Sequence, residues 1–271
     1  MTPPLELAFS PCPNDTFVFH AWAHGLVPDA PPARVTFADI DVTNTAAERG
    51  EFDVVKVSYA ALPWLMGSHT LLGSGGALGR GCGPLVLTRE PLPDLDGRTV
   101  AVPSARSTAY LLFRLWAQRQ RPARIDVVPF SAIMPAVRDG RYDAGLVIHE
   151  ARFVYQDYGL TALADLGQWW EADTGLPIPL GAILARRSLD AALLTHVVRA
   201  SVEHAWADPA ASAGFVAEHA AELAPDVQRQ HIALYVNEFT RDLGEEGHAA
   251  VRALLDRAHA AGLTPATPPL R

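Results

Sequence analysis

The residue best placed for acid–base chemistry is His149, which ends the apolar run 144–148. The run follows the turn signal Gly-Arg-Tyr-Asp at 140–143, and a short apolar run of this kind predicts a strand buried on both faces of a parallel sheet. Ligands of open α/β sheets bind beyond the carboxyl ends of the strands. Because an imidazole exchanges a proton near neutral pH, His149 is a candidate general base. The competing interpretation is a structural histidine bonded to Glu150 or to a carbonyl.

Lys56 is a second candidate, because it is the single lysine among 22 basic residues. It lies in the apolar segment 52–57, which predicts a strand that ends at Ser58. Ser58 is a further candidate for substrate binding. A lysine in an apolar strand needs a partner or a route to water. Its ammonium could therefore bind a substrate carboxylate, pair with an acid or reach solvent at a sheet edge. Schiff-base chemistry needs a desolvated lysine, and nothing in the sequence favours it here.

The turn at residues 104–108 leads from a predicted strand into a predicted helix over 109–118. The free N–H groups and positive dipole end of a helix N-terminus suit a carboxylate. Ser107 and Thr108 add hydroxyl groups, and Ala109 leaves room for a ligand to approach the backbone. The alternative is that Ser107 only caps its helix.

The turn at residues 10–16 has the same position in the first part of the chain, with Asn14 or Asp15 as the predicted N-cap. We expect Asn14 to contribute to ligand binding. Cys12 precedes this helix, where a thiol pKa can fall. Because two prolines flank it, we interpret Cys12 as a packing residue.

The glycine-rich loop 73–83 resembles a phosphate-binding loop only in composition. It lacks the spacing G-x-G-x-x-G and does not end in Gly-Lys-Ser/Thr. We interpret it as a structural turn near a hinge, with Arg80 held in it.

The elements that position these candidate residues form two predicted α/β units. Strands are predicted at 5–9, 34–40 and 52–57, and the plan returns about ninety residues later at 98–102, 124–128 and 144–148. Helices separate the strands, so each unit is β-α-β-α-β and demands parallel pairing. Helices are also predicted at 43–49, 59–66, 131–138 and, near the C-terminus, over 193–206, 215–223, 227–237 and 245–261.

The chain leaves the first unit and returns to it through the strand-like segment 176–186. We predict lobe 1 from residues 1–90 and 182–271, and lobe 2 from residues 91–181, which carries His149. Two crossings with a ligand cleft between lobes are typical of the type II periplasmic binding protein fold, with mixed, mainly parallel sheets.

Composition and charge disfavour several classes of function. The 271 residues are 49% hydrophobic and carry a formal net charge of -8, which disfavours nucleic acid as a partner. The two cysteines form no disulfide framework, and no metal-ligand spacing is present. There is no signal-peptide pattern and no apolar run of membrane-spanning length. We expect a cytoplasmic protein with a small anionic substrate and no membrane insertion; the oligomeric state stays open.

Five motifs carry a resemblance to a known family. They are Ser-Pro-Cys-Pro-Asn-Asp-Thr-Phe (10–17), Lys-Val-Ser-Tyr-Ala-Ala (56–61), Ser-Gly-Gly-Ala-Leu-Gly-Arg-Gly (74–81), Ile-His-Glu-Ala-Arg-Phe (148–153) and Leu-Gly-Ala-Ile-Leu-Ala-Arg-Arg (180–187). Together they resemble the 1,4-dihydroxy-6-naphthoate synthase family, from about residue 5 to the last predicted helix.

The resemblance implies a cytoplasmic enzyme of the futalosine route to menaquinone, with a periplasmic-binding-protein-like fold and no cofactor. It implies that cyclic dehypoxanthinyl futalosine is cleaved to 1,4-dihydroxy-6-naphthoate and a fragment related to dihydroxyacetone. The general base of the family falls on His149. Its substrate contacts fall on Val55, Lys56 and Val57, and on Thr108 and Ala109.

Three other functions fit the same fold. The first is a chorismate dehydratase-like enzyme of the same pathway, against which the Ile-His-Glu segment at 148–150 argues. The second is a non-catalytic solute-binding protein, which would need export. The third is the sensor domain of a regulator, for which a DNA-binding half is missing from the sequence.

Overall fold

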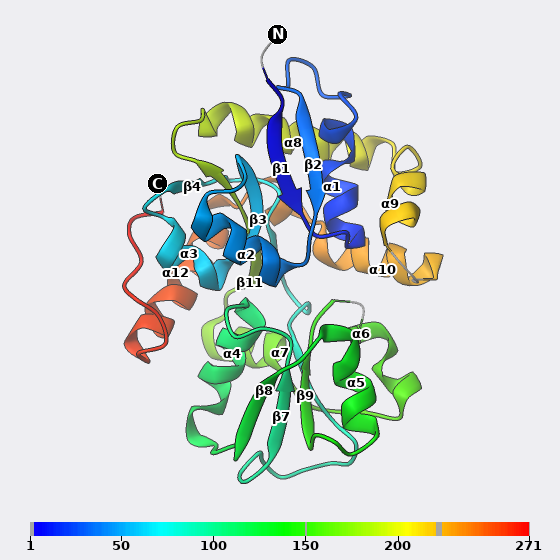
Figure 1. Ribbon diagram of the computed structural model, residues 1–271, viewed down its shortest axis with the longest axis vertical. Coiled ribbons are helices and arrows are strands. Elements are labelled where there is room, and N and C mark those ends of the chain that lie inside the picture. Colours follow the sequence, from blue (N-terminus) through cyan, green and yellow to red (C-terminus); the bar gives the residue numbers. More distant parts are fainter. Residues whose placement is uncertain (1–2, 150, 221–223, 271) are drawn as a thin grey trace.

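The computed structural model describes residues 3–149, 151–220 and 224–270, which form two α/β lobes, one above the other in Figure 1. Each lobe is built on one sheet. The upper sheet has the order β2 (Ala33–Phe37), β1 (Leu5–Phe9), β3 (Val54–Ser58), β11 (Ile178–Arg186), β4 (His69–Leu71), with β5 (Ala77–Gly79) also paired to β11. The lower sheet has the order β10 (Thr161–Asp165), β6 (Leu85–Thr88), β9 (Ala144–Val147), β7 (Thr99–Val102), β8 (Arg124–Val127).

The predicted duplication is visible in the strand pairing. In the upper sheet β1 lies parallel to β2 and β3, and in the lower sheet β7 lies parallel to β8 and β9. A strand of opposite direction then joins each set, since β11 pairs antiparallel with β3 and β6 pairs antiparallel with β9. Both β3 and β9 are buried along their whole length, as their apolar sequences predicted.

The strand pairing shifts the predicted lobe boundaries. The prediction placed residues 85–88 in lobe 1, and this is wrong, because β6 pairs with β9 and β10 of the lower sheet. The boundary at 182 is also too late, since β11 begins at Ile178 and belongs to the upper sheet. A fully buried apolar strand such as β6 needs neighbours that satisfy its backbone groups, and only the lower sheet supplies them.

Helices cover both sheets (Figure 1). They are α1 (Pro13–Ala23), α2 (Ile40–Arg49), α3 (Leu62–Leu65), α4 (Thr108–Trp116), α5 (Phe130–Arg138), α6 (Ala151–Val154), α7 (Leu166–Thr174), α8 (Ala191–Ala207), α9 (Ala213–His219), α10 (Pro225–Tyr235), α11 (Glu238–Arg241) and α12 (Gly244–Ala260). The predicted helix 59–66 is a 3₁₀-helix, η1 (Tyr59–Ala61), followed by α3. The end of the predicted helix 215–223 lies outside the described residues.

The lobes are joined by apolar packing on one side. A single cluster of buried side chains runs from Val57 and Leu62 of the upper lobe through Ile178 and Leu254 to Leu112 and Trp170 of the lower lobe. In Figure 1, α12 and α3 lie at this joined side, and α6 and α10 lie at the other. Among the described residues, no helix is long and apolar enough to cross a membrane.

The first crossing between the lobes, after β5 and before β6, touches the start of α7 at Gly83 and Gly167. The backbone N–H of Leu166 donates to the Pro84 carbonyl over 2.9 Å, and a Cβ added to Gly83 would lie 2.1 Å from the Gly167 nitrogen. We therefore expect Gly83→Ala to destabilise the protein by about 3 kcal/mol in urea unfolding, because backbone must move to admit the methyl group.

Gly67→Ala is the matched control. Gly67 is exposed, and nothing lies within 4 Å of an added Cβ. A Gly83→Ala protein as stable as this control would contradict the close approach of the first crossing to the start of α7.

Candidate active site

The cleft between the lobes holds two adjoining cavities. The inner cavity has an empty volume of about 650 Å³ and the outer one of about 1440 Å³. The residues that line both cavities, and so mark their junction, are Ile40, Ser107, Ile148 and His149. His149 therefore lies between a chamber deep in the cleft and a chamber at its mouth.

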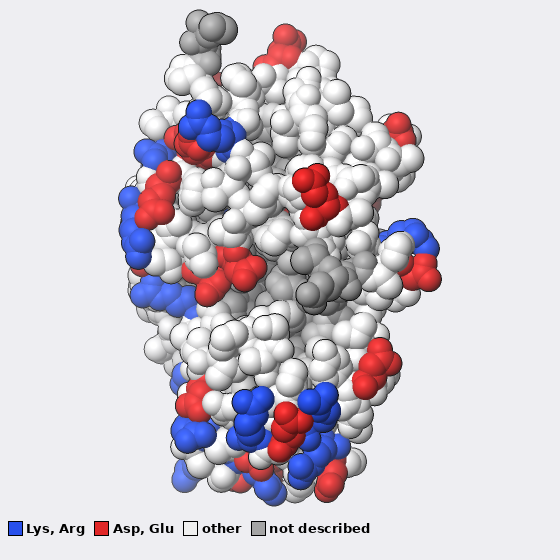
Figure 2. Space-filling view, turned by 45° about the vertical axis from the view of Figure 1, so that its right-hand side comes forward, with Lys and Arg blue, Asp and Glu red and all other residues white. Residues whose placement is uncertain are grey.

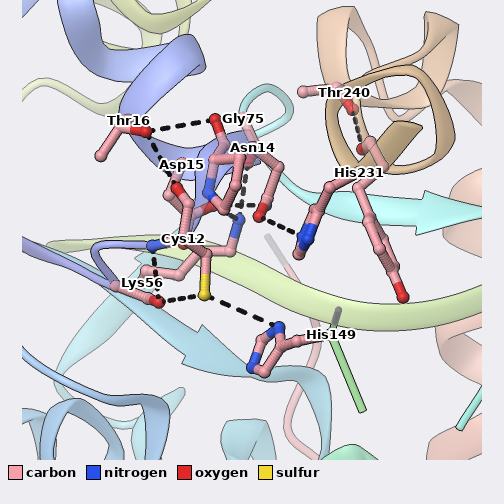
Figure 3. A network of polar contacts seen from close by, with 12 residues as sticks. Cys12, Asn14, Asp15, Thr16, Lys56, Gly75, His149, His231 and Thr240 are labelled. Atoms are coloured by element: carbon pink, nitrogen blue, oxygen red, sulfur yellow. Dashed lines mark hydrogen bonds and ion pairs between the residues drawn. The ribbon is translucent and has the colours of Figure 1, made fainter. Parts of the chain in front are cut away.

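His149 follows β9 in a backbone conformation with φ of 55°, which is uncommon for a residue other than glycine. Residues in such conformations cluster at active sites and ligand-binding sites. The Nδ1 of His149 lies 3.7 Å from the sulfur of Cys12, which belongs to the other lobe (Figure 3). The Phe130 ring meets the imidazole edge-on, at 5.8 Å between centroids. Glu150, the alternative partner of His149, lies outside the described residues.

Cys12 is the N-cap of α1, so the predicted N-cap at Asn14 or Asp15 is wrong. Pro13 is the reason, because proline is favoured in the first turn and starts the helix earlier. The Ser10 hydroxyl donates to the Cys12 sulfur over 2.7 Å and accepts the Cys12 N–H over 3.2 Å. Cys12 is partly exposed and lines the outer cavity, so it is more than the packing residue that we predicted.

Lys56 pairs with an acid, which was one of the interpretations left open by the sequence. Its ammonium donates to the Asp15 carboxylate over 2.7 Å and to the Gly75 carbonyl over 3.2 Å. Both side chains of the ion pair are only 4% exposed. Gly181 makes room for the lysine, since a Cβ there would lie 2.8 Å from Lys56 Cε. Lys56 lines the inner cavity, but its charge is compensated within its own lobe.

Asn14 and His231 continue the polar contacts of this pair. The Asn14 amide donates to Asp15 over 2.8 Å, and its oxygen lies 3.1 Å from His231 Nε2. His231, on α10, is fully buried, and burial lowers its pKa from 6.5 to about 3, with the nearby His149 contributing in the same direction. Sequence reasoning missed His231, because it is one of several histidines on predicted helices and no local motif marks it.

The predicted contacts at the start of α4 reach the cleft, but their hydroxyl groups are already engaged. Ser107 is the N-cap and accepts from the Tyr110 N–H over 3.2 Å, as the capping alternative predicted. The Thr108 hydroxyl accepts from Ala60 N–H over 3.1 Å and donates to the Leu180 carbonyl over 2.8 Å, which ties the lobes together. Ser107, Thr108 and Ala109 all line the inner cavity.

The remaining residues singled out from the sequence differ in whether they line the cleft. Ser58 lines the inner cavity and exchanges hydrogen bonds with Asn44. Val55 and Val57 are fully buried in the apolar cluster that joins the lobes, and they line neither cavity. Arg80 lies outside the cleft and donates to Glu246 and to the Gly175 carbonyl. Within the described ranges, no three His, Cys, Asp or Glu side chains are grouped so that they could hold a metal ion.

The fold and the interlobe cleft define a class of protein, the periplasmic-binding-protein-like proteins. The chain is similar to the periplasmic aliphatic sulphonate binding protein of Escherichia coli, with a TM-score of 0.71 and 16% identity over 100% of this chain and 91% of that chain. It is also similar to a protein of Archaeoglobus fulgidus, with a TM-score of 0.89 and 32% identity over 96% of this chain and 98% of that one.

The sequence comparisons define the family. A family model described as menaquinone biosynthesis matches residues 5–260. Proteins named 1,4-dihydroxy-6-naphtoate synthase from Streptomyces coelicolor and Thermus thermophilus are 67% and 47% identical to the chain; the alignments cover 98% and 97% of it, and 96% and 97% of those proteins. The chain belongs to the menaquinone biosynthesis family and, within it, to the 1,4-dihydroxy-6-naphthoate synthases.

The buried ion pair of Lys56 and Asp15 leads to a prediction about the stability of the protein. We expect Lys56→Met to cost about 3–5 kcal/mol in urea unfolding, because it leaves the Asp15 carboxylate buried without a compensating charge. The double variant Lys56→Met with Asp15→Leu should recover most of that loss, since neither charge then remains. A double variant less stable than Lys56→Met alone would contradict this account.

The two cysteines should differ in reactivity. We expect iodoacetamide to label Cys12 in the folded protein, because its thiol borders the outer cavity. Cys82 is 1% exposed, and burial raises its pKa to about 12, so it should stay unlabelled. Peptide mass spectrometry measures both sites, with Cys12→Ser as the control. Labelling of Cys82 at the rate of Cys12 would refute this assignment.

Proposed function

We propose that the protein is a cytoplasmic, cofactor-independent carbon–carbon lyase that converts cyclic dehypoxanthinyl futalosine to 1,4-dihydroxy-6-naphthoate. Family membership supports the product, because the two curated relatives carry that product in their names. The observation that carries the proposal is the position of His149 at the junction of the two cavities, where it can meet a substrate that spans both.

In this proposal His149 removes a proton next to a carbonyl group of the substrate. The electrons left behind form an enolate, whose pair then makes a ring double bond as the adjacent carbon–carbon bond breaks. The bonding pair leaves with the fragment related to dihydroxyacetone, and protonated His149 returns the proton to that fragment. The reaction has no net oxidation or reduction, so a base and a stabilised oxyanion suffice.

The substrate carboxylate is proposed to meet the start of α4, where free backbone N–H groups and the helix dipole favour an anion. Binding of the substrate carboxylate by Lys56 was one of the interpretations left open by the sequence. Because its ammonium is neutralised by Asp15, we now assign it a supporting role in the wall of the inner cavity.

The lining of each cavity suggests how the substrate lies. Ile148, Leu180, Ala77 and Ala109 give the inner cavity apolar walls suited to the flat bicycle. Asp39, Asp41 and Ser104 line the outer cavity and can bind the hydroxyl groups of the sugar-derived part. In Figure 2, acidic side chains lie on the surface near the level where the two lobes meet. This orientation places the reacting carbons near His149.

Lobe closure is the proposed means of excluding water from the reaction. Cys12 and His149 come from different lobes and touch across the cleft. The Arg106 side chain reaches from the lower lobe to pair with Glu48 on α2, and it also lies over the Trp64 ring, 5.6 Å from its centroid. Both contacts would be broken in an open form.

The test is to incubate the purified protein with cyclic dehypoxanthinyl futalosine, without added cofactor, and to measure 1,4-dihydroxy-6-naphthoate by liquid chromatography. We expect His149→Ala to lower kcat by about 10²–10⁴-fold with little change in thermal stability, because a positioned base contributes that much. His196→Ala, an exposed histidine on α8, is the control and should react like the unchanged protein.

Near-normal turnover by a folded His149→Ala protein would end the assignment of His149 as the base. Ligand binding by the unchanged protein without any turnover would favour the solute-binding alternative. Turnover of chorismate instead would favour the dehydratase.

A further inference from the structure

Four buried polar side chains, Lys56, Asp15, Asn14 and His231, are joined end to end beside the inner cavity (Figure 3). The whole side chain of each is at most 7% exposed. The row runs from β3 through the first turn of α1 to α10, and all four residues line the inner cavity.

The direction of every hydrogen bond in this row follows from its charged end. A lysine ammonium only donates, and the Asp15 carboxylate only accepts. Asn14 must therefore turn its amide nitrogen to Asp15, which leaves its amide oxygen facing His231. Because that oxygen can only accept, His231 must carry its proton on Nε2.

The other ring nitrogen of His231 is then a lone-pair acceptor. Burial keeps the imidazole neutral at physiological pH, so no second proton occupies Nδ1. Nδ1 is buried and has no hydrogen-bond partner among the described residues. A buried polar atom without a partner is costly, and native proteins retain few of them without a reason.

The position of His231 supplies a reason. Its ring lies nearly parallel to that of His149, with an angle of 18° and 6.1 Å between the centroids. The two imidazoles come from different lobes and border the same cavity. A ligand within reach of the proposed base is therefore also close to His231.

We infer that His231 is a ligand-binding residue whose Nδ1 accepts a hydrogen bond from a hydroxyl group of the molecule in the inner cavity. The identity of that molecule rests on the proposed function, under which a ring hydroxyl of 1,4-dihydroxy-6-naphthoate is the donor. An acceptor at this place selects a hydroxyl over a ketone or a methoxy group, which offer no hydrogen. His149 moves the proton, and His231 recognises the ring oxygen.

Two substitutions separate this role from a structural one. A glutamine amide nitrogen reaches the place of Nε2, so His231→Gln keeps the donor to Asn14 and removes the acceptor. An asparagine amide reaches the place of Nδ1, so His231→Asn keeps an acceptor there and loses the bond to Asn14. We expect the glutamine variant to be stable and to bind 1,4-dihydroxy-6-naphthoate about tenfold or more weakly. The asparagine variant should be less stable and should bind more tightly than the glutamine variant.

The affinity is measured by fluorescence titration without oxygen, and the same titration with 1,4-dimethoxy-6-naphthoate completes a double-mutant cycle. The unchanged protein should prefer the dihydroxy compound, and His231→Gln should lose that preference. His69→Gln is the control, because His69 is also buried with an unpartnered ring nitrogen but borders neither cavity. Its affinity should be unchanged.

The outcomes distinguish this inference from the proposed function. If the unchanged protein forms no naphthoate from cyclic dehypoxanthinyl futalosine, the proposed function fails. If it forms naphthoate but His231→Gln binds the product as tightly and as selectively as the unchanged protein, the role of His231 alone is overturned. Ring ¹⁵N spectra test the first step separately: a proton on Nδ1 of His231, or protonation of its ring near neutral pH, would also overturn it.

Discussion

The buried ion pair of Lys56 and Asp15 is the interaction on which the cleft depends. Two charges this far from water are stable only together, and their pairing fixes β3 against the first turn of α1. A carboxylate in that turn also suits the positive end of the helix dipole. The pair holds the start of α1 in place, and that start carries Cys12 toward His149 on one side and Asn14 toward His231 on the other. A charge that could have bound substrate instead organises the residues that we propose to do so.

The duplicated β-α-β-α-β order explains how one chain forms two different walls of the cleft. In both lobes the third strand of the unit is fully buried and ends at the cleft. In the upper lobe, β3 ends at Ser58, and the ammonium of Lys56 stays paired with Asp15 inside that lobe. The lower strand, β9, ends at Val147, and the chain then turns through the left-handed conformation of His149. The same topology thus presents a fixed, neutralised charge from one side and a titratable ring from the other.

Electrically, the inner cavity is close to neutral. Among the described residues that line it are one compensated ion pair and a histidine held neutral by burial, and none of them is an arginine. Under the proposed function, an anionic substrate would depend there on dipoles, chiefly the N-terminus of α4. The position of that N-terminus is secured by the contacts of Thr108 with Ala60 and Leu180. Contacts between the lobes therefore set the geometry of the proposed anion site as well as joining the two walls of the cleft.

Local pattern determined the parts of this protein that depend on neighbours in sequence. The apolar runs predicted β3 and β9, and the predicted helix 43–49 ends where α2 ends. The repeated β-α-β-α-β order predicted two lobes with His149 at a strand end. The half-exposed strand β10 and the three-residue strands β4 and β5 left no such pattern and were missed. Only the tertiary structure decided the partner of Lys56, the sheet to which β6 belongs, and the place of His231 beside the cavity. Asp15 is 41 residues from Lys56 and Asn14 is 217 from His231. Contacts of this kind depend on how whole helices and strands pack against one another. Residue type and spacing along the chain do not reveal that packing.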